Sequence, residues 1–118
     1  MLLADTSIWI DHFRRGDREF GEELSRGEVL MHPFILGEIS CGNLKDRTKV
    51  LFGLSWLTRA PRATDEDVAE LVEQRRLWGK GLGWIDAHLL ASAILSDCRF
   101  RTLDQRLDRA ARELGIPA

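Results

Sequence analysis

Several features of common protein classes are missing from this sequence of 118 residues. It has only two cysteines, Cys41 and Cys98, without C-x-x-C spacing, so neither a disulfide framework nor a zinc site is expected. No apolar run is long enough to suggest a membrane span, and residues 1–5 show no basic region leading into an apolar segment, so no secretory signal is expected. These absences favour the reducing cytoplasm, with both cysteines as small buried residues.

Little in the chain divides it into parts. The three prolines are isolated, and there is no repeat, low-complexity tract or linker rich in Pro, Gly or Ser. A length of 118 residues suits one compact domain, so a single domain over residues 1–118 is predicted. With 44% hydrophobic and 31% charged residues, the composition is that of a globular protein rather than a disordered one.

Neither sign of charge dominates, because 17 Lys and Arg stand against 19 Asp and Glu, a net charge of −2. This balance alone does not indicate a nucleic-acid-binding protein. Fourteen of the basic residues are Arg, which suits phosphate recognition and equally suits a GC-rich genome. Five basic residues are open to two interpretations, a phosphate-binding rim or ordinary exposed helix surface: Arg14, Arg15, Arg75, Arg76 and Lys80.

Short apolar runs alternate with helical patterns along the chain. Strands are expected at residues 2–4, 29–31, 61–63 and 99–103, although the arginines of the last are unusual for a buried strand. Helices are expected over residues 8–14, 17–26, 33–41, 46–58, 64–77, 85–95 and 104–114. The alternation predicts an α/β, three-layer domain with a mostly parallel central sheet of four to five short strands flanked by helices.

Two acids directly follow predicted strands. Asp5 comes after the strand at residues 2–4, and Asp104 comes after the strand at residues 99–103. Because ligands of open α/β sheets gather beyond the carboxyl ends of the strands, both side chains are expected at one edge of the sheet. Each aspartate is also a favourable helix N-cap, and for either residue taken singly that explanation is equally good.

Two further acids share the apolar stripe of a predicted helix. Glu38 follows Ile35 by three residues, and Asp86 precedes Leu89 by three, which places each acid along a packed face. Burying an unpaired carboxylate is costly or forces it to take up a proton. A position at the boundary of the stripe is the simpler explanation, and a polar pocket at the sheet edge is the functional one.

Four carboxylates in one pocket repel one another, and no Lys or Arg is evidently placed to neutralise them. A divalent cation does so, and oxygen ligands suit Mg²⁺, with Mn²⁺ as a substitute. Such a site activates water and stabilises charge on a transferring phosphoryl group. Metal-dependent phosphodiester hydrolysis is the chemistry that follows most directly.

The chain resembles the PIN-domain ribonucleases, and among them the VapC-type toxins of bacterial toxin–antitoxin pairs. Order, spacing and length agree over essentially the whole chain. The resemblance rests on four motifs, which are Asp5-Thr6-Ser7 after a strand, Ile35-Leu36-Gly37-Glu38 on a helix, Ile85-Asp86-Ala87 heading a helix rich in Ala and Leu, and Thr102-Leu103-Asp104 after a strand.

This resemblance implies a PIN-like fold and an endonuclease of single-stranded RNA that requires Mg²⁺ or Mn²⁺ and leaves a 5′-phosphate and a 3′-hydroxyl. The acids at the matching positions would be both catalytic and metal-binding. Asp5 and Asp86 would be direct ligands, and Glu38 and Asp104 would act partly through water. Either Glu38 or Asp104 would orient the attacking water.

The family resemblance extends to supporting groups and partners. Thr6 and Thr102 match hydroxyl positions that orient waters or neighbouring acids. A homodimer is implied, held inactive by a VapB-like antitoxin whose basic side chain or helix enters the acidic pocket. The helix around residues 50–57, with Phe52 and Trp56 adding bulk, is the contact surface that we expect.

Two other functions stay open. The first is a catalytically inactive PIN-like module that serves only for binding or dimerisation, although the presence of all four acids argues against it. The second is a receiver-like phosphoacceptor domain, which also has an acidic pocket at its strand ends. That domain needs a second acid adjacent to Asp5 and a lysine late in the chain, whereas the last lysine here is Lys80.

Overall fold

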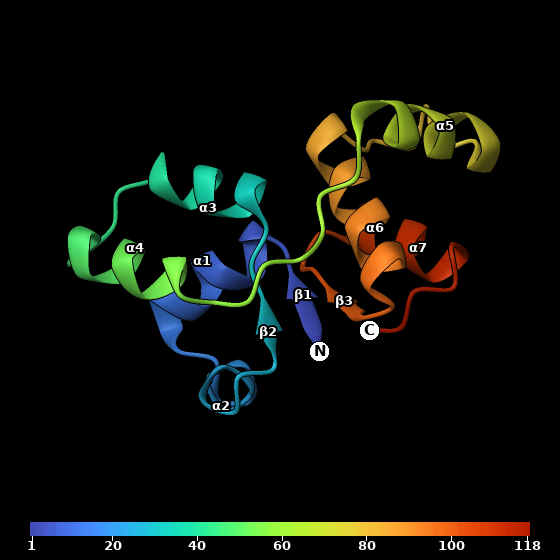
Figure 1. Cartoon of the computed structure of the whole chain (residues 1–118). Helices are drawn as coiled ribbons and strands as arrows, with labels where there is room; N and C mark the ends of the chain where they lie inside the picture. The colour runs from blue at the N-terminus through green and yellow to red at the C-terminus, as the bar shows by residue number, and fades with distance from the viewer.

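Strand β1 (Leu2–Ala4) lies at the centre of the fold because its three apolar side chains are completely buried. It pairs in parallel with β2 (Val29–Leu30) on one side and with β3 (Arg99–Arg101) on the other, which gives the order β2-β1-β3. The computed structural model describes all 118 residues and places helices on both sides of this sheet (Figure 1). The predicted α/β architecture with a parallel sheet is confirmed.

Seven helices occur in the order that the alternating pattern predicts. Their bounds are α1 (Thr6–Arg15), α2 (Arg18–Ser25), α3 (Pro33–Ser40), α4 (Arg47–Ser55), α5 (Asp65–Arg75), α6 (Trp84–Ser96) and α7 (Gln105–Glu113). In Figure 1, α1 to α4 gather on one side and α5 to α7 on the other, with residues 56–64 connecting the two groups. None of the helices is both long and apolar enough to cross a lipid bilayer.

The sheet has three strands, so the prediction of four to five is wrong. Residues 61–63 form no strand, and the chain instead makes a single parallel bridge between Met31 and Arg59, with backbone hydrogen bonds of 2.8 Å on both sides of Arg59. Pro61 follows two residues later and has no N–H with which to continue a ladder, so pairing stops there.

Side-chain caps fix where several helices begin. Asp5, Asp17, Thr64 and Asp104 each accept a hydrogen bond from a backbone N–H in the first turn of the helix that follows. Pro33 stands at the start of α3, where a missing N–H costs nothing. These caps place the first turns of α1 and α7 directly beside the ends of β1 and β3.

The carboxyl ends of the strands define the edge at which the acids are expected. Strand β1 leads into α1 through Asp5, and β3 leads into α7 through residues 102–104. Two residues separate the end of α6 from β3, and α6 packs along this strand, so it runs antiparallel to the strands (Figure 1). Its N-terminal turn, which carries Asp86, therefore lies on the side of the sheet where the strands end.

Glu23 accounts for the arginines that make β3 unusually basic. Its carboxylate, on α2, is only 3% exposed and accepts hydrogen bonds of 2.7 Å from both Arg99 Nη2 and Arg101 Nη1. Burial acts to raise the pKa of Glu23, but the hydrogen bonds from Arg101 and Arg99 outweigh it and hold that pKa below its ordinary value. Two cations on a short strand thus neutralise one buried acid.

The two cysteines differ in their surroundings. Cys98 is buried beneath the start of β3, as predicted. Cys41 is exposed, so the prediction that it is buried is wrong. It forms the C-cap of α3, and this position at a helix end overrides the usual preference of cysteine for burial.

Two completely buried histidines lie between α3 and α6. Nδ1 of His32 accepts a hydrogen bond of 3.0 Å from the backbone N–H of Phe34 and so caps α3. Nε2 of His88 lies 3.0 Å from Asp65 Oδ1, and its ring packs edge-on against Phe34 with ring centroids 4.9 Å apart. These are the contacts of packed core side chains.

We expect His32 to make the fold less stable at acid pH. Burial is the main cause that lowers the pKa of His32 from 6.5 to about 4, and the nearby charges of Arg62 and Arg59 act in the same direction. The unfolded chain takes up a proton below pH 6.5 while the folded chain does not, so this stabilisation is complete above pH 6.5 and is lost as the pH falls towards 4. The loss in the free energy of unfolding reaches about 3 kcal/mol at most.

Chemical denaturation across this pH range checks the expectation. His32→Asn keeps a side chain that can cap α3 but removes the titrating ring, so its free energy of unfolding should change less with pH than that of the wild type. An equal pH dependence in the two proteins would contradict it.

Candidate active site

Asp5 is held at the carboxyl end of β1 by hydroxyl and backbone groups. Its Oδ1 caps α1 by accepting hydrogen bonds from Ser7 N at 3.1 Å and Ile8 N at 3.4 Å, and it also accepts one from Ser7 Oγ. Its Oδ2 accepts a hydrogen bond of 2.6 Å from Thr102 Oγ1. The residue is 8% exposed, and this burial raises its pKa although the hydrogen bonds from Ser7 and Thr102 oppose the shift.

Thr102 connects Asp5 to Asp104. Its hydroxyl donates to Asp5 and accepts a hydrogen bond of 3.0 Å from the backbone N–H of Asp104. Asp104 Oδ1 then caps α7 by accepting from Arg106 N at 2.9 Å and from Leu107 N at 3.4 Å. Asp5 and Asp104 are therefore both helix N-caps and neighbours at one edge of the sheet. The capping role and the shared position at the edge do not exclude each other.

Glu38 joins this edge from α3. Its Oε1 accepts a hydrogen bond of 2.9 Å from Thr6 Oγ1, one residue after Asp5. The prediction that Glu38 lies on a packed face is wrong, because the residue is exposed while Ile35, one turn earlier, is completely buried. The buried stripe of α3 runs from Ile35 to Ile39, so Glu38 lies beside it and its carboxylate faces solvent next to the first turn of α1.

Asp86 lies in the first turn of α6 and is half-buried. Its Oδ2 accepts a hydrogen bond of 2.8 Å from the backbone N–H of Gly83, which closes the start of the helix. No hydrogen bond connects it to Asp5, Glu38 or Asp104. The structure thus connects Asp5 to Asp104 through the Thr102 hydroxyl and holds Glu38 beside them through Thr6, the residue that follows Asp5. It places Asp86 separately on the same side of the sheet.

Comparison with known proteins gives the family. The family model described as "PIN domain" matches residues 2–113. Two curated relatives, both named Ribonuclease VapC32 and both from Mycobacterium tuberculosis (strains CDC 1551 / Oshkosh and H37Rv), are 43% identical to the chain over 117 residues, covering 98% of the chain and 94% of each relative. The chain belongs to the PIN-domain family, of the VapC type. The resemblance seen in the four motifs is confirmed, and a receiver-like domain is excluded.

The acids of this PIN domain have no cationic side chain to balance them. None of the four predicted carboxylates forms an ion pair, whereas buried Glu23 has two arginines. In three of them one oxygen takes no hydrogen bond from the protein, namely Glu38 Oε2, Asp86 Oδ1 and Asp104 Oδ2. Oxygen donors without a positive partner are suited to a hard divalent cation.

The acids do not form a closed cage. No three His, Cys, Asp or Glu side chains converge closely enough to hold one ion between them. Mg²⁺ is commonly held by one or two carboxylates while it keeps several waters, so an open edge with carboxylates at different depths fits that ion better than a fully enclosed site does. The residues present are therefore compatible with Mg²⁺ or Mn²⁺.

Ser7 is a further member of this hydrogen-bonded edge, and sequence reasoning gave it no role of its own. Its hydroxyl donates to Asp5, lies 3.4 Å from Thr102 Oγ1 and accepts a hydrogen bond of 2.9 Å from the backbone N–H of Leu103. The only signal in the sequence is its place in the Asp5-Thr6-Ser7 motif. Thr102 and Leu103 lie 95 and 96 residues further along the chain, beyond the reach of any local pattern.

Proposed function

We propose that this protein is an endoribonuclease that hydrolyses RNA phosphodiester bonds with the help of Mg²⁺ and acts as the toxin of a toxin–antitoxin pair. The observation that carries the proposal is the edge of carboxylates without cationic partners, where Thr102 connects Asp5 to Asp104 and Thr6, next to Asp5, holds Glu38. The relatives named Ribonuclease VapC32, 43% identical over 98% of the chain, support the same chemistry.

Each residue of the edge has a proposed role in this reaction. Asp5 and Asp86 would hold the cation directly, and Glu38 and Asp104 would do so partly through water. When bound, the cation would stabilise negative charge on the phosphoryl oxygens and make a water more acidic. Either Glu38 or Asp104, each with one free carboxylate oxygen, would orient the attacking water and accept its proton.

The surrounding hydroxyls would keep these carboxylates in place. Thr102 fixes Oδ2 of Asp5, Ser7 fixes Oδ1, and Thr6 fixes one oxygen of Glu38. Attack of the water oxygen on phosphorus would break the bond to the 3′ oxygen, which takes up a proton. The products would be a 3′-hydroxyl and a 5′-phosphate.

The test is cleavage of a labelled structured RNA by purified, antitoxin-free protein in Mg²⁺, Mn²⁺ or EDTA. Cleavage that requires the cation supports the proposal. The same samples are melted with and without Mn²⁺, because a ligand that binds only the folded state raises the melting temperature. Absence of both cleavage and a Mn²⁺-dependent rise would favour the alternative, a catalytically inactive PIN-like module.

We also propose a homodimer and a VapB-like antitoxin as partners, with α4 as the dimer contact. Phe52 and Trp56 are 65% and 75% exposed at this helix and pack against each other with ring centroids 6.0 Å apart. Large exposed aromatics on one surface are typical of protein interfaces. Phe52→Glu should convert the dimer into a soluble monomer in light-scattering measurements, and an unchanged dimer would count against this placement.

A further inference from the structure

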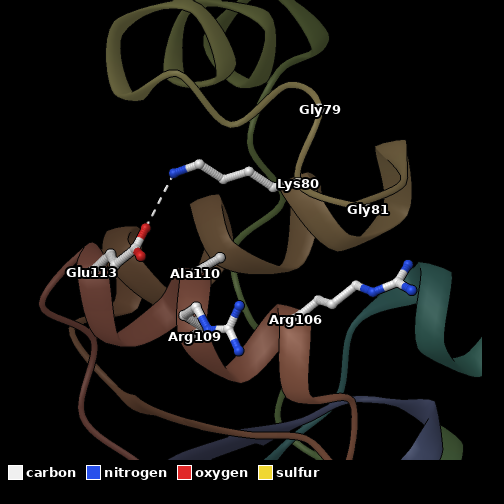
Figure 2. Close-up of a pocket in the computed structure, with 7 residues that line it drawn as sticks. All are labelled: Gly79, Lys80, Gly81, Arg106, Arg109, Ala110 and Glu113. Atoms are coloured by element: carbon white, nitrogen blue, oxygen red, sulfur yellow. Dashed lines mark hydrogen bonds and ion pairs between the residues drawn. The ribbon is translucent and has the colours of Figure 1, made fainter.

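A basic hollow of about 520 Å³ lies between the glycine-rich loop before α6 and the exposed face of α7. Figure 2 shows Lys80 extending from the loop towards Glu113, Arg109 extending from α7 below it, and Arg106 extending from α7 to the opposite side, under Gly81. Arg106 and Arg109 are one helical turn apart, so both side chains leave α7 on the same face. Only one acid, Glu113, lines the hollow.

The charges of this hollow are not balanced within the protein. Lys80 Nζ forms an ion pair of 3.1 Å with Glu113 Oε2, whereas neither Arg106 nor Arg109 is paired with any carboxylate. Three cations against one anion leave a local charge of +2 on a chain whose net charge is −2. An excess of guanidinium groups in a concave surface indicates an anionic ligand, because guanidinium binds phosphate through paired N–H donors.

Gly81 keeps the guanidinium of Arg106 against the loop. This glycine has φ +79°, and a Cβ built on it would lie 2.6 Å from both Cδ and Nη1 of Arg106. Any side chain at this position would therefore displace Arg106 as well as strain the backbone. The loop is shaped so that the arginine can lie directly over it.

The chain connects the hollow to the acidic edge on both sides. The glycine-rich loop continues into Gly83, whose N–H donates to Asp86, and Asp104, the N-cap of α7, lies two residues before Arg106. We propose that Arg106 and Arg109, with Lys80 beside them, bind backbone phosphates of the single-stranded RNA whose scissile bond lies at the acidic edge. This inference rests on the proposed ribonuclease activity and assigns the site that positions its substrate.

An acidic segment of a protein partner is the rival occupant. RNA is favoured because a polyanion cleaved at an edge of four carboxylates must be drawn there by positive charge, and the two elements that carry the charge of this hollow lead directly to Asp86 and Asp104. An acidic peptide bound in the hollow would gain nothing from the connection to Asp86 and Asp104. Phosphate also matches the two unpaired guanidiniums better than an isolated carboxylate does, since it offers more acceptor oxygens.

The test measures RNA binding separately from cleavage. Fluorescence anisotropy with a fluorescein-labelled, mixed-sequence single-stranded RNA in EDTA compares the wild type with the double variant R106Q/R109Q over a range of salt concentrations. The matched control is R112Q, which removes one charge from the same helix where Arg112 pairs with Asp108 outside the hollow. Melting temperatures establish that all three proteins fold, which we expect because the substituted arginines are exposed.

We expect R106Q/R109Q to weaken binding roughly tenfold, with R112Q close to the wild type. The slope of log K against log salt should fall by about 0.7 for each phosphate that the double variant no longer neutralises. A double variant that binds RNA as the wild type does overturns the inference, and cleavage by the wild type in Mg²⁺ then still upholds the proposed function.

Two other results also overturn the inference. Equal losses of binding free energy per removed charge in R112Q and the double variant do so, because they indicate diffuse charge rather than a site. Wild-type protein that does not bind RNA but binds an acidic peptide through the same arginines assigns the hollow to a protein partner instead.

Discussion

Asp5→Asn is expected to lose RNA cleavage by at least about 100-fold while melting at or above the wild-type temperature. The activity falls because an amide replaces a carboxylate that would hold the cation directly. The fold survives because asparagine is as good an N-cap as aspartate, so the start of α1 keeps its hydrogen bonds. Removing a buried charge that has no cationic partner relieves its desolvation cost.

Opposite effects on activity and stability are what separate a functional acid from a structural one. If Asp5 served only to cap α1, Asp5→Asn would change neither property much. The measurement pairs an RNA cleavage assay in Mg²⁺ with thermal melting of the same preparation. Cleavage at the wild-type rate would remove Asp5 from the proposed metal site.

Thr102→Val is expected to lose less cleavage activity than Asp5→Asn. It removes the hydroxyl that fixes Oδ2 of Asp5 but leaves the carboxylate itself. Loss of a group that orients a metal ligand typically costs about 10- to 100-fold in activity or metal affinity, so an intermediate rate is expected. A loss as large as that of Asp5→Asn would indicate that Thr102 contacts the reacting groups directly.

Most helices and strands can be predicted from the sequence because their starts and ends are determined by residues only a few positions away. Asp5, Thr64 and Asp104 cap helices within three positions of themselves, and Pro33 and Gly16 mark a helix start and a helix end. The prediction of a fourth strand at residues 61–63 is wrong because strand pairing depends on a distant partner. The local sequence does not show that the chain forms only one bridge, between Arg59 and Met31, before it reaches Pro61.

Long-range contacts are the part that the sequence does not reveal. Glu23 looks like an ordinary helix acid, and its two arginines lie 76 and 78 residues away. The spacing of Glu38 to Ile35 predicts a packed face, yet Glu38 contacts Thr6 from an exposed position. Periodicity describes one helix at a time, whereas the neighbour that covers or leaves open a given face is set by the topology.

Capping explains how so many acids share one edge without unfolding it. Asp5, Asp86 and Asp104 each accept backbone N–H groups at the start of a helix, where the helix dipole favours negative charge. Part of the repulsion among them is thereby offset by α1, α6 and α7 rather than by Lys or Arg. Because the N-termini of these helices stabilise the negative charges, other carboxylate oxygens at the edge can remain free for a cation.

Glu23→Gln is expected to lower the free energy of unfolding by about 3 kcal/mol and the melting temperature by about 10 °C. The variant leaves Arg99 and Arg101 without their carboxylate, and their side chains are 37% and 20% exposed, so solvent compensates for only part of the loss. Because the folded pKa of Glu23 lies below its ordinary 4.5, the wild-type advantage is complete above pH 4.5 and is lost as the pH falls through the folded value.

Glu22→Gln is the matched control for this prediction. Glu22 is the neighbouring residue on α2, its side chain is 56% exposed, and it pairs only with Arg18, which is 94% exposed. Such a surface pair contributes at most about 0.5 kcal/mol, so Glu22→Gln should unfold close to the wild type. Denaturant titrations of the three proteins at pH 7 and pH 4 distinguish the two positions. Equal stability of the two variants at pH 7 would show that the arginines of β3 do not depend on a buried acid.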